Sequence, residues 1–250
     1  MKAVILAAGK STRLQPLTNN CPKPMLKVCG KPMLEHIISQ LAHFGFREII
    51  ITTHFVPEKI VAYFGNGARW GVNITYANEP ELMNTAGSLR LIKHLLVDDF
   101  LVIGGNDFLP EINLNRFLMF HSEGKQIDGH ICTIAFKRML DHKLAALFGQ
   151  GVLDLKGQLI CFQEKPAVFL SEYVHTTYQI YTADALGYIP EKTPFAIPND
   201  LIPALLGAGK VIRGYITESP FICISSREQY EHAQIQIAAY AKILKERAGT

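Results

Sequence analysis

The sequence predicts an α/β fold, in which a mixed, mostly parallel sheet is flanked by helices. In the first half of the chain, strand-like and helix-like segments alternate, as successive βαβ units require. The first strand-like segment contains the apolar run at residues 4–6, which is typical of a parallel strand covered on both faces. With 250 residues and 48% hydrophobic content the chain can bury one sizeable core, so we expect a single domain over residues 1–250.

Hydrophobic periodicity predicts the elements in chain order. Residues 32–44 place apolar side chains on one helical face, before a strand at 48–53. A second helical face, at residues 91–96, precedes a strand at 100–103. Further strands are expected at residues 130–136, 151–155, 159–162, 174–181 and 211–216. The final predicted helix covers residues 227–246, and its inward face carries Tyr230, Ala233, Ile237, Tyr240 and Leu244.

The loop after the first strand combines small residues with two cations. Ala8 and Gly9 carry little or no side chain, so a phosphate or a base can approach the backbone closely. Arg13 can make forked hydrogen bonds to phosphate oxygens, and Lys23, between two prolines, offers a compact point charge. This layout indicates a nucleoside triphosphate site.

Two common phosphate motifs do not fit this loop. The string from Gly9 to Thr12 resembles the end of a P-loop, but that motif needs a glycine where Val4 stands. A dinucleotide fingerprint would need glycines at the positions of Ser11 and Leu14. For the loop taken alone, an ordinary strand-to-helix turn with surface cations remains the alternative.

Composition excludes several classes of partner. A net charge of +3, without a basic run interleaved with aromatic residues, argues against nucleic acid. The five cysteines show no metal-ligand spacing, which favours free thiols in a reducing compartment. No stretch reaches the roughly 20 apolar residues of a membrane span. The apolar start at residues 3–8 is too short for a signal peptide, so we expect a cytoplasmic protein without a membrane partner.

Several motifs together resemble the signature of the sugar-1-phosphate nucleotidyltransferases, and mannose-1-phosphate guanylyltransferase-like members in particular. The loop follows the pattern L-A-A-G-x-G-T-R-L-x-P-L-T and then P-K-P, with Ser11 in place of the second glycine. Further matches are G-K-P-M at 30–33, N-T-A-G-S-L at 84–89, a strand ending in N-D at 101–107, and E-K-P at 164–166. The resemblance implies the Rossmann-like nucleotide-diphospho-sugar transferase fold, without a C-terminal β-helix domain.

The resemblance also implies a reaction. A nucleoside monophosphate would pass from a nucleoside triphosphate to a sugar-1-phosphate, giving a nucleotide-diphosphate sugar and pyrophosphate. Such a substitution depends on alignment and on neutralising phosphate charge. By resemblance, Arg13 would hold the leaving pyrophosphate, Lys23 the α-phosphate region and Lys165 the attacking phosphate. Asp107 would bind Mg²⁺, the implied cofactor.

The binding residues follow from the same resemblance. Glu164 and Gln179 would contact the sugar. The nucleotide would contact Leu6, Ala8, Gly9, Ser11, Thr12, Glu79, Asn84 and Thr85. Each of these residues also has a purely structural interpretation. Lys165 could be a solvated loop lysine, Asp107 could cap the next segment, and Glu79 and Asn84 could be polar turn residues.

Two departures from the family pattern keep other functions open. Cys223 stands where a second metal-binding aspartate is expected, and a neutral thiol is a poor ligand for Mg²⁺. Gln179 replaces a glycine of the sugar pocket. The alternatives are a nucleotide or sugar-phosphate binding protein with little activity, and a cytidylyltransferase that acts on a non-sugar phosphate such as choline phosphate. The nucleobase and the sugar cannot be read from the sequence, and a homo-oligomer remains open.

Overall fold

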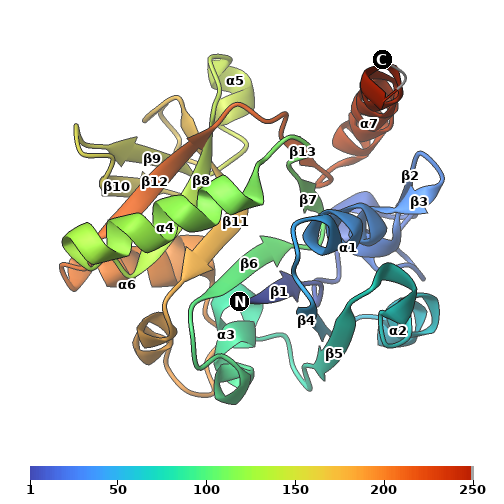
Figure 1. Cartoon of the computed structure of the whole chain (residues 1–250), viewed down its shortest axis with the longest axis horizontal. Helices are drawn as coiled ribbons and strands as arrows, with labels where there is room; N and C mark the ends of the chain where they lie inside the picture. The colour runs from blue at the N-terminus through green and yellow to red at the C-terminus, as the bar shows by residue number, and fades with distance from the viewer. Residues whose placement is uncertain (249–250) are drawn as a thin grey trace.

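A nine-stranded sheet forms the centre of the computed structural model, which describes residues 1–248 (Figure 1). In the last helix, side chains are described up to Tyr240 and at Lys242. The strands of this sheet are β1 (Lys2–Leu6), β4 (Glu48–Thr53), β5 (Asn73–Asn78), β6 (Phe100–Gly104), β8 (Cys132–Arg138), β9 (Gln150–Leu153), β10 (Leu159–Gln163), β11 (Tyr173–Tyr181) and β12 (Ile212–Thr217). Two small sheets pair β2 (Lys27–Val28) with β3 (Lys31–Pro32), and β7 (Asp107–Phe108) with β13 (Ile222–Cys223).

Helices cover both faces of the large sheet. The α-helices are α1 (Met33–His43), α2 (Pro57–Phe64), α3 (Asn84–Leu91), α4 (Leu114–Asp128), α5 (His142–Ala145), α6 (Ile202–Gly207) and α7 (Arg227–Ala248). Short 3-10 turns lie at Thr12–Leu14, Lys23–Met25, Ala68–Trp70, Lys93–Leu95 and Ala183–Tyr188, and a π-turn lies at Ile197–Leu201. Among the described residues, no helix is long and apolar enough to span a bilayer.

The sheet is mixed, as the sequence predicts. One path runs β10-β9-β11-β6-β1-β4-β5, and β8 adds a second branch between β11 and β12. The strands β6, β1, β4 and β5 are mutually parallel, so their carboxyl ends share one edge. The strand β11 joins this parallel half to β8 by antiparallel pairing on both sides. The carboxyl ends of these parallel strands therefore form the edge of the sheet at which a ligand site is expected.

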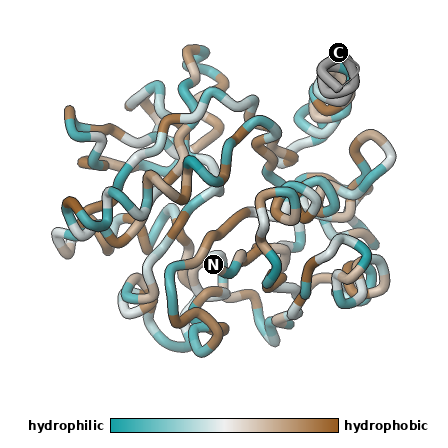
Figure 2. The backbone as a smooth tube through the Cα atoms, in the orientation of Figure 1, coloured by the Kyte–Doolittle hydropathy of each residue, from teal (hydrophilic) through white to brown (hydrophobic). Residues whose placement is uncertain are grey.

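The apolar run of β1 is buried on both faces. Ile5 packs in the core with Ile37 of α1, whereas Val4 packs in the opposite core with Leu89 of α3. Successive strand residues point to opposite faces, so a strand covered on both sides needs apolar residues at every position. The same reasoning applies to β6, which lies in the brown centre of Figure 2.

The predicted elements are present, with shifted boundaries. The strands predicted in the second half correspond to β8, β9, β10, β11 and β12. The apolar face at residues 91–96 forms the end of α3 and a 3-10 turn instead of one helix. Ile92 and Leu96 are buried as the pattern predicts, whereas Leu91 is exposed. In α7, Ala233 and Ile237 face the core as predicted, while the side chain of Leu244 lies outside the described residues.

A buried polar network fastens α4 to β8, far from the edge where β1 and β6 end. The rings of His121 and His130 both contact the hydroxyl of Thr133, at 2.8 and 2.9 Å. His121 also lies 3.3 Å from Asp99, and His130 lies 3.1 Å from Asp128. Burial, with a smaller contribution from His130, lowers the pKa of His121 from 6.5 to about 4.

This low pKa predicts a loss of stability in mild acid. Between pH 6.5 and 4 the unfolded chain binds a proton at His121 that the folded chain excludes. We expect the free energy of unfolding to fall over this range by about 2–3 kcal/mol through His121. Urea unfolding at several pH values should show a shallower dependence in His121→Gln than in the parent, whereas exposed His232→Gln should leave it unchanged. An unaltered slope in His121→Gln would contradict the assignment.

Candidate active site

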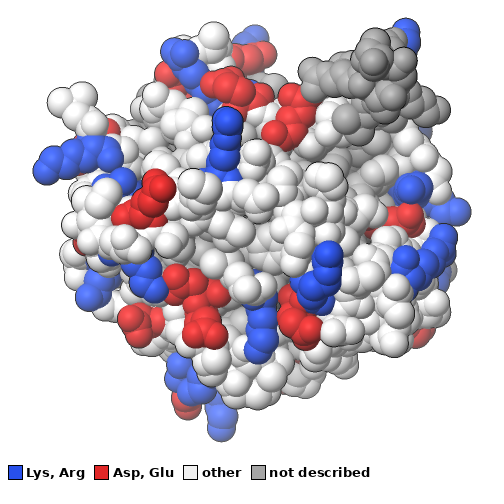
Figure 3. Space-filling model, viewed as in Figure 1, with Lys and Arg blue, Asp and Glu red and all other residues white. Residues whose placement is uncertain are grey.

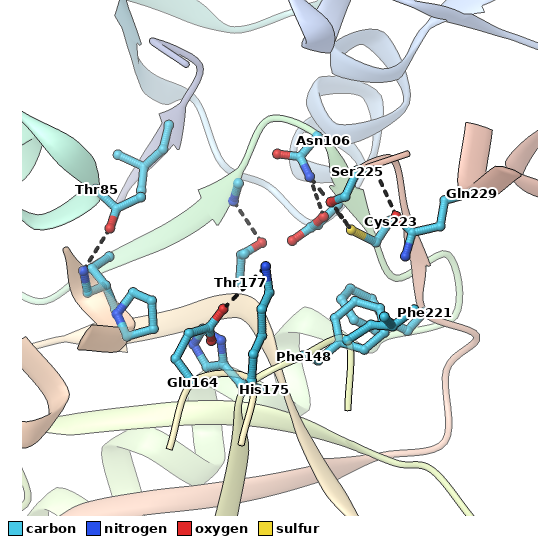
Figure 4. A pocket seen from close by; sticks show the side chains of 18 of the residues that line it. Thr85, Asn106, Phe148, Glu164, His175, Thr177, Phe221, Cys223, Ser225 and Gln229 are labelled. Atoms are coloured by element: carbon cyan, nitrogen blue, oxygen red, sulfur yellow. Dashed lines mark hydrogen bonds and ion pairs between the residues drawn. The ribbon is translucent and has the colours of Figure 1, made fainter. Parts of the chain in front are cut away.

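A pocket of about 760 Å³ opens at the carboxyl ends of β1 and β6, which end at Leu6 and Gly104. Its opposite wall comes from the second half of the chain, in segments around Phe148, Glu164 and Phe221 (Figure 4). Ligands of open α/β sheets bind at this edge. The pocket is therefore the candidate active site.

The pocket gathers many of the residues predicted from the sequence. Those that line it are Leu6, Arg13, Thr85, Asp107, Glu164, Lys165 and Gln179. The loop residues Ala8, Gly9, Ser11 and Thr12 follow β1 beside the pocket and are not part of its lining. Residues that are separated by more than 150 positions in the chain thus meet at one site.

The loop after β1 holds a conformation that favours glycine. Ser11 has φ +54°, in the left-handed region. Its carbonyl accepts hydrogen bonds from Leu14 N–H and from the hydroxyl of Thr18, at 3.2 and 2.8 Å. These bonds hold the turn that aims the following Arg13 toward the pocket. The position where the family pattern has glycine is therefore strained in this chain.

Charged groups converge beside this loop. Burial lowers the pKa of Lys23, and the neighbouring charges act on it in both directions. Cys223 and Asp107 raise that pKa, whereas Arg13 and Lys165 lower it further. The three cations predicted for phosphate binding are thus close enough to influence one another. Such a cluster suits a polyanionic ligand, because the ligand supplies the balancing negative charge.

Asp107 and Cys223 face each other across the small β7–β13 sheet, where they are paired in register. Burial raises the pKa of Asp107, and the Cys223 thiol, which donates a hydrogen bond to the carboxylate, opposes this. Asn106 Nδ2 donates to Asp107 Oδ1 at 2.6 Å. Cys223 Sγ lies 3.0 Å from Ser225 Oγ. One buried carboxylate and one thiol therefore form this corner of the pocket.

This corner fits a divalent cation only if the substrate completes the coordination. Among the described residues, no three His, Cys, Asp or Glu side chains gather to hold a metal by themselves. Asp107 offers a single carboxylate. Magnesium commonly keeps several waters and borrows phosphate oxygens, so a site with one carboxylate is compatible with it when a triphosphate is bound.

The acceptor side of the pocket carries an adjacent carboxylate and ammonium. Lys165 Nζ lies 3.9 Å from Glu164 Oε1, and Lys165 adopts φ +46°. Burial raises the pKa of Glu164, while the positive charges of Lys165 and Arg13 lower it. Gly149 closes this wall, since a Cβ there would lie 2.6 Å from Glu164 Oε2. The absence of a side chain at Gly149 thus leaves room for the carboxylate.

Gln179 is held rigidly in the pocket wall. Its Nε2 lies 2.9 Å from His175 Nε2, and its Oε1 accepts a hydrogen bond from the Tyr181 hydroxyl. Burial lowers the pKa of His175 to about 4, so the neutral ring accepts the amide proton. Sequence reasoning missed His175. A usable signal was present, because His175 precedes Thr177 by two residues and Gln179 by four on one strand, and alternate strand residues point to the same face.

Other lining residues were also missed. Thr177 Oγ1 accepts from Gly104 N–H at 2.8 Å and ties β11 to the end of β6. Phe148 and Phe221 form an aromatic pair, with ring centroids 5.1 Å apart. Figure 4 shows this pair on the side of the pocket opposite Thr85. Ordinary apolar residues in loops carry no sequence signal for such a role.

Glu79 and Asn84 do not line the pocket. The carboxylate of Glu79 is buried and accepts hydrogen bonds from Ser88 Oγ at 2.5 Å and Met83 N–H at 3.2 Å. It holds the start of α3, as a polar turn residue would. Asn84 is exposed and begins α3 with φ +59°, a conformation that asparagine tolerates better than most residues. Neighbouring Thr85 does reach the pocket.

The strained position of Ser11 generates a prediction. Ser11→Val should destabilise the protein by about 1–2 kcal/mol, because a β-branched side chain is poorly tolerated at positive φ. Ser11→Gly should stay within about 1 kcal/mol of the parent, since relief of strain offsets the greater freedom of the unfolded chain. Urea unfolding measures both changes. Equal stability of the valine and glycine variants would show that the loop does not hold this conformation.

Comparison with known proteins finds a matching protein family and similar curated proteins. The family model described as nucleotidyl transferase matches residues 2–218. A UTP–glucose-1-phosphate uridylyltransferase of Synechocystis sp. is 34% identical over 84% of this chain and 56% of the relative. A mannose-1-phosphate guanylyltransferase of Mycobacterium tuberculosis is 29% identical over 87% of this chain and 59% of the relative. The chain thus spans less than two thirds of the length of these curated relatives.

A solved structure shares the fold. A Bacillus anthracis protein assigned as a glucose-1-phosphate thymidylyltransferase, in complex with sucrose, superposes with a TM-score of 0.84. The alignment covers 94% of each chain at 23% sequence identity. The prediction of the transferase fold is therefore confirmed. Because the family model matches most of the sequence, the chain belongs to the nucleotidyl transferase family.

Proposed function

We propose that this protein transfers a nucleoside monophosphate from a nucleoside triphosphate to a sugar-1-phosphate, releasing pyrophosphate. The observation that carries the proposal is the convergence of Arg13, Lys23 and Lys165 around Asp107 at the carboxyl edge of the sheet. The names of the relatives, which include a uridylyltransferase and a guanylyltransferase, support a nucleotide-diphosphate sugar as the product.

The pocket has a nucleotide side and an acceptor side. The loop after β1 would bind the triphosphate through the backbone of Ala8, Gly9, Ser11 and Thr12, close to Leu6 and Thr85. On the acceptor side, Glu164 would accept hydrogen bonds from sugar hydroxyls, with Gln179 in the adjoining wall.

Chemistry in this pocket needs alignment more than covalent help. Lys165 would hold the attacking phosphate, whose oxygen is already ionised and needs no general base. Arg13 would bind the leaving pyrophosphate through its forked donors, and Lys23 would neutralise charge near the α-phosphate. Asp107 would hold a divalent cation, for which Mg²⁺ is the family's common choice. When bound, the cation offsets charge on the phosphates.

The remaining features support a small-molecule enzyme. On the face drawn in Figure 3, basic and acidic side chains of the described residues are interspersed, which does not favour nucleic acid. The five cysteines are free thiols, which supports the cytosol as the compartment.

A second candidate acts on a phosphate other than that of a sugar, such as choline phosphate. The aromatic pair Phe148 and Phe221 lies on the same pocket wall as Glu164. Aromatic faces beside a carboxylate attract quaternary ammonium groups. Gln179 fills a position where the family pattern has glycine, which favours a compact acceptor. A binding protein with little activity is the remaining alternative.

The substrate is identified by a matrix of nucleoside triphosphates against sugar-1-phosphates and choline phosphate, with pyrophosphate release as the readout. For the pair that reacts, Arg13→Ala and Lys165→Ala should each lower kcat/KM by about 100-fold or more, because each removes a cation from the transition state. Lys10→Ala, at an exposed loop position outside the pocket, should change it little. Equal effects at Lys10 and Arg13 would contradict the assignment. Absence of any reaction, with nucleotide binding retained in calorimetry, would favour the binding protein.

A glycine on the acceptor side provides a separate test. Gly149→Ala should push aside both the Glu164 carboxylate and the neighbouring Phe162 ring, and raise the acceptor KM roughly tenfold to hundredfold, as small misplacements do in active sites. The nucleotide KM should change much less. Gly207→Ala is the matched control, because a Cβ there meets no atom within 4 Å. A Gly149→Ala enzyme with normal acceptor KM would show that Glu164 does not contact the acceptor.

A further inference from the structure

The corner of the pocket beside Asp107 carries a sulfur atom that the proposed reaction does not require. Cys223 lies directly across the β7–β13 pair from Asp107, and its thiol donates to that carboxylate. Both residues line the pocket, and Figure 4 shows the Cys223 sulfur directed toward the group of Asn106 and Ser225. A cation held by Asp107 would therefore lie close to this sulfur.

We propose that Cys223 and Asp107 together form a mixed sulfur and oxygen site that prefers Co²⁺ or Zn²⁺ to Mg²⁺. This inference rests on the proposed role of Asp107 as the cation ligand. Metal affinity follows ligand softness, and Mg²⁺ gains little from sulfur, whereas Co²⁺ and Zn²⁺ bind thiolates well. The metal preference should therefore depend on whether sulfur or oxygen is the donor atom at position 223.

The charge balance favours this arrangement. When a thiophilic cation binds, the Cys223 S–H bond breaks, the sulfur–metal bond forms with the sulfur electron pair, and the proton leaves to solvent. The thiolate then supplies the second negative charge that a carboxylate would supply at the same position. The remaining coordination positions would fall to water and to substrate phosphate, since no three His, Cys, Asp or Glu side chains gather to hold a metal among the described residues.

The geometry distinguishes Cys223 from the other thiols. Cys29 and Cys161 are exposed and lie outside the pocket. Cys132 is buried within β8. Cys21 is half-buried and outside the pocket lining. Among the cysteines, only Cys223 is paired with a carboxylate inside the pocket formed by the described residues, so a site-specific metal signal can be assigned to it.

The test is a titration of the full chain with Cd²⁺ and with Co²⁺, monitored by the ultraviolet sulfur-to-metal charge-transfer absorption. We expect the absorption to saturate at one equivalent of metal and to be lost in Cys223→Ser. The Kd for Co²⁺ should rise roughly tenfold or more in that variant, since loss of even an outer-shell partner has an effect of this size. Asp107→Asn should weaken binding while retaining a sulfur signal at higher metal concentration. The double variant Cys29→Ser/Cys161→Ser is the control and should keep the signal.

Activity provides an independent second readout. In the reacting substrate pair, the ratio of kcat/KM with Co²⁺ to that with Mg²⁺ should fall in Cys223→Asp, because a hard oxygen replaces the sulfur. A charge-transfer signal that survives in Cys223→Ser, or no signal at all, would overturn the proposal. Failure of every substrate pair would count against the proposed function alone, because the spectroscopic titration does not depend on turnover.

Discussion

The parallel pairing of β1 with β6 is the constraint on which the site depends. It places Leu6 opposite Gly104, and the N–H of Gly105 then donates to the carbonyl of Leu6 at 2.9 Å. A Cβ at Gly105 would lie 2.9 Å from Pro24 Cγ, so the glycine lets the proline pack against the strand end. This close contact brings Lys23 beside Asp107. Two segments far apart in the sequence thus meet because β6 ends in Gly104 and is followed by Gly105.

Electrostatics then follows from this packing. Arg13, Lys23 and Lys165 are gathered around a corner that contains the carboxylates of Asp107 and Glu164. Burial lowers the pKa of Lys23, and repulsion from the nearby cations Arg13 and Lys165 adds to this effect. A triphosphate relieves both effects by adding negative charge. The arrangement is therefore poised for an anionic ligand before any ligand arrives.

Departures from the family pattern are accommodated by the backbone and by neighbours. Ser11 and Asn84 both have positive φ, and at Ser11 the family pattern has glycine. The chain keeps the glycine conformation there and bears the strain of a side chain. Gln179 is accommodated in another way, since His175 and Tyr181 bind its amide. At Cys223 the change alters the donor chemistry and leaves the strand pairing intact.

The sequence by itself determined the fold class, most of the elements and the charged residues of the pocket, because these depend on local periodicity and on a motif with unusual residue types. Arg13, Asp107, Glu164 and Lys165 were found in this way, and all line the pocket. Only the tertiary structure decided that Glu79 is used to hold α3, and that Phe148 and Phe221 form a wall. These roles depend on contacts between segments distant in the chain, and such contacts leave no local pattern in the sequence.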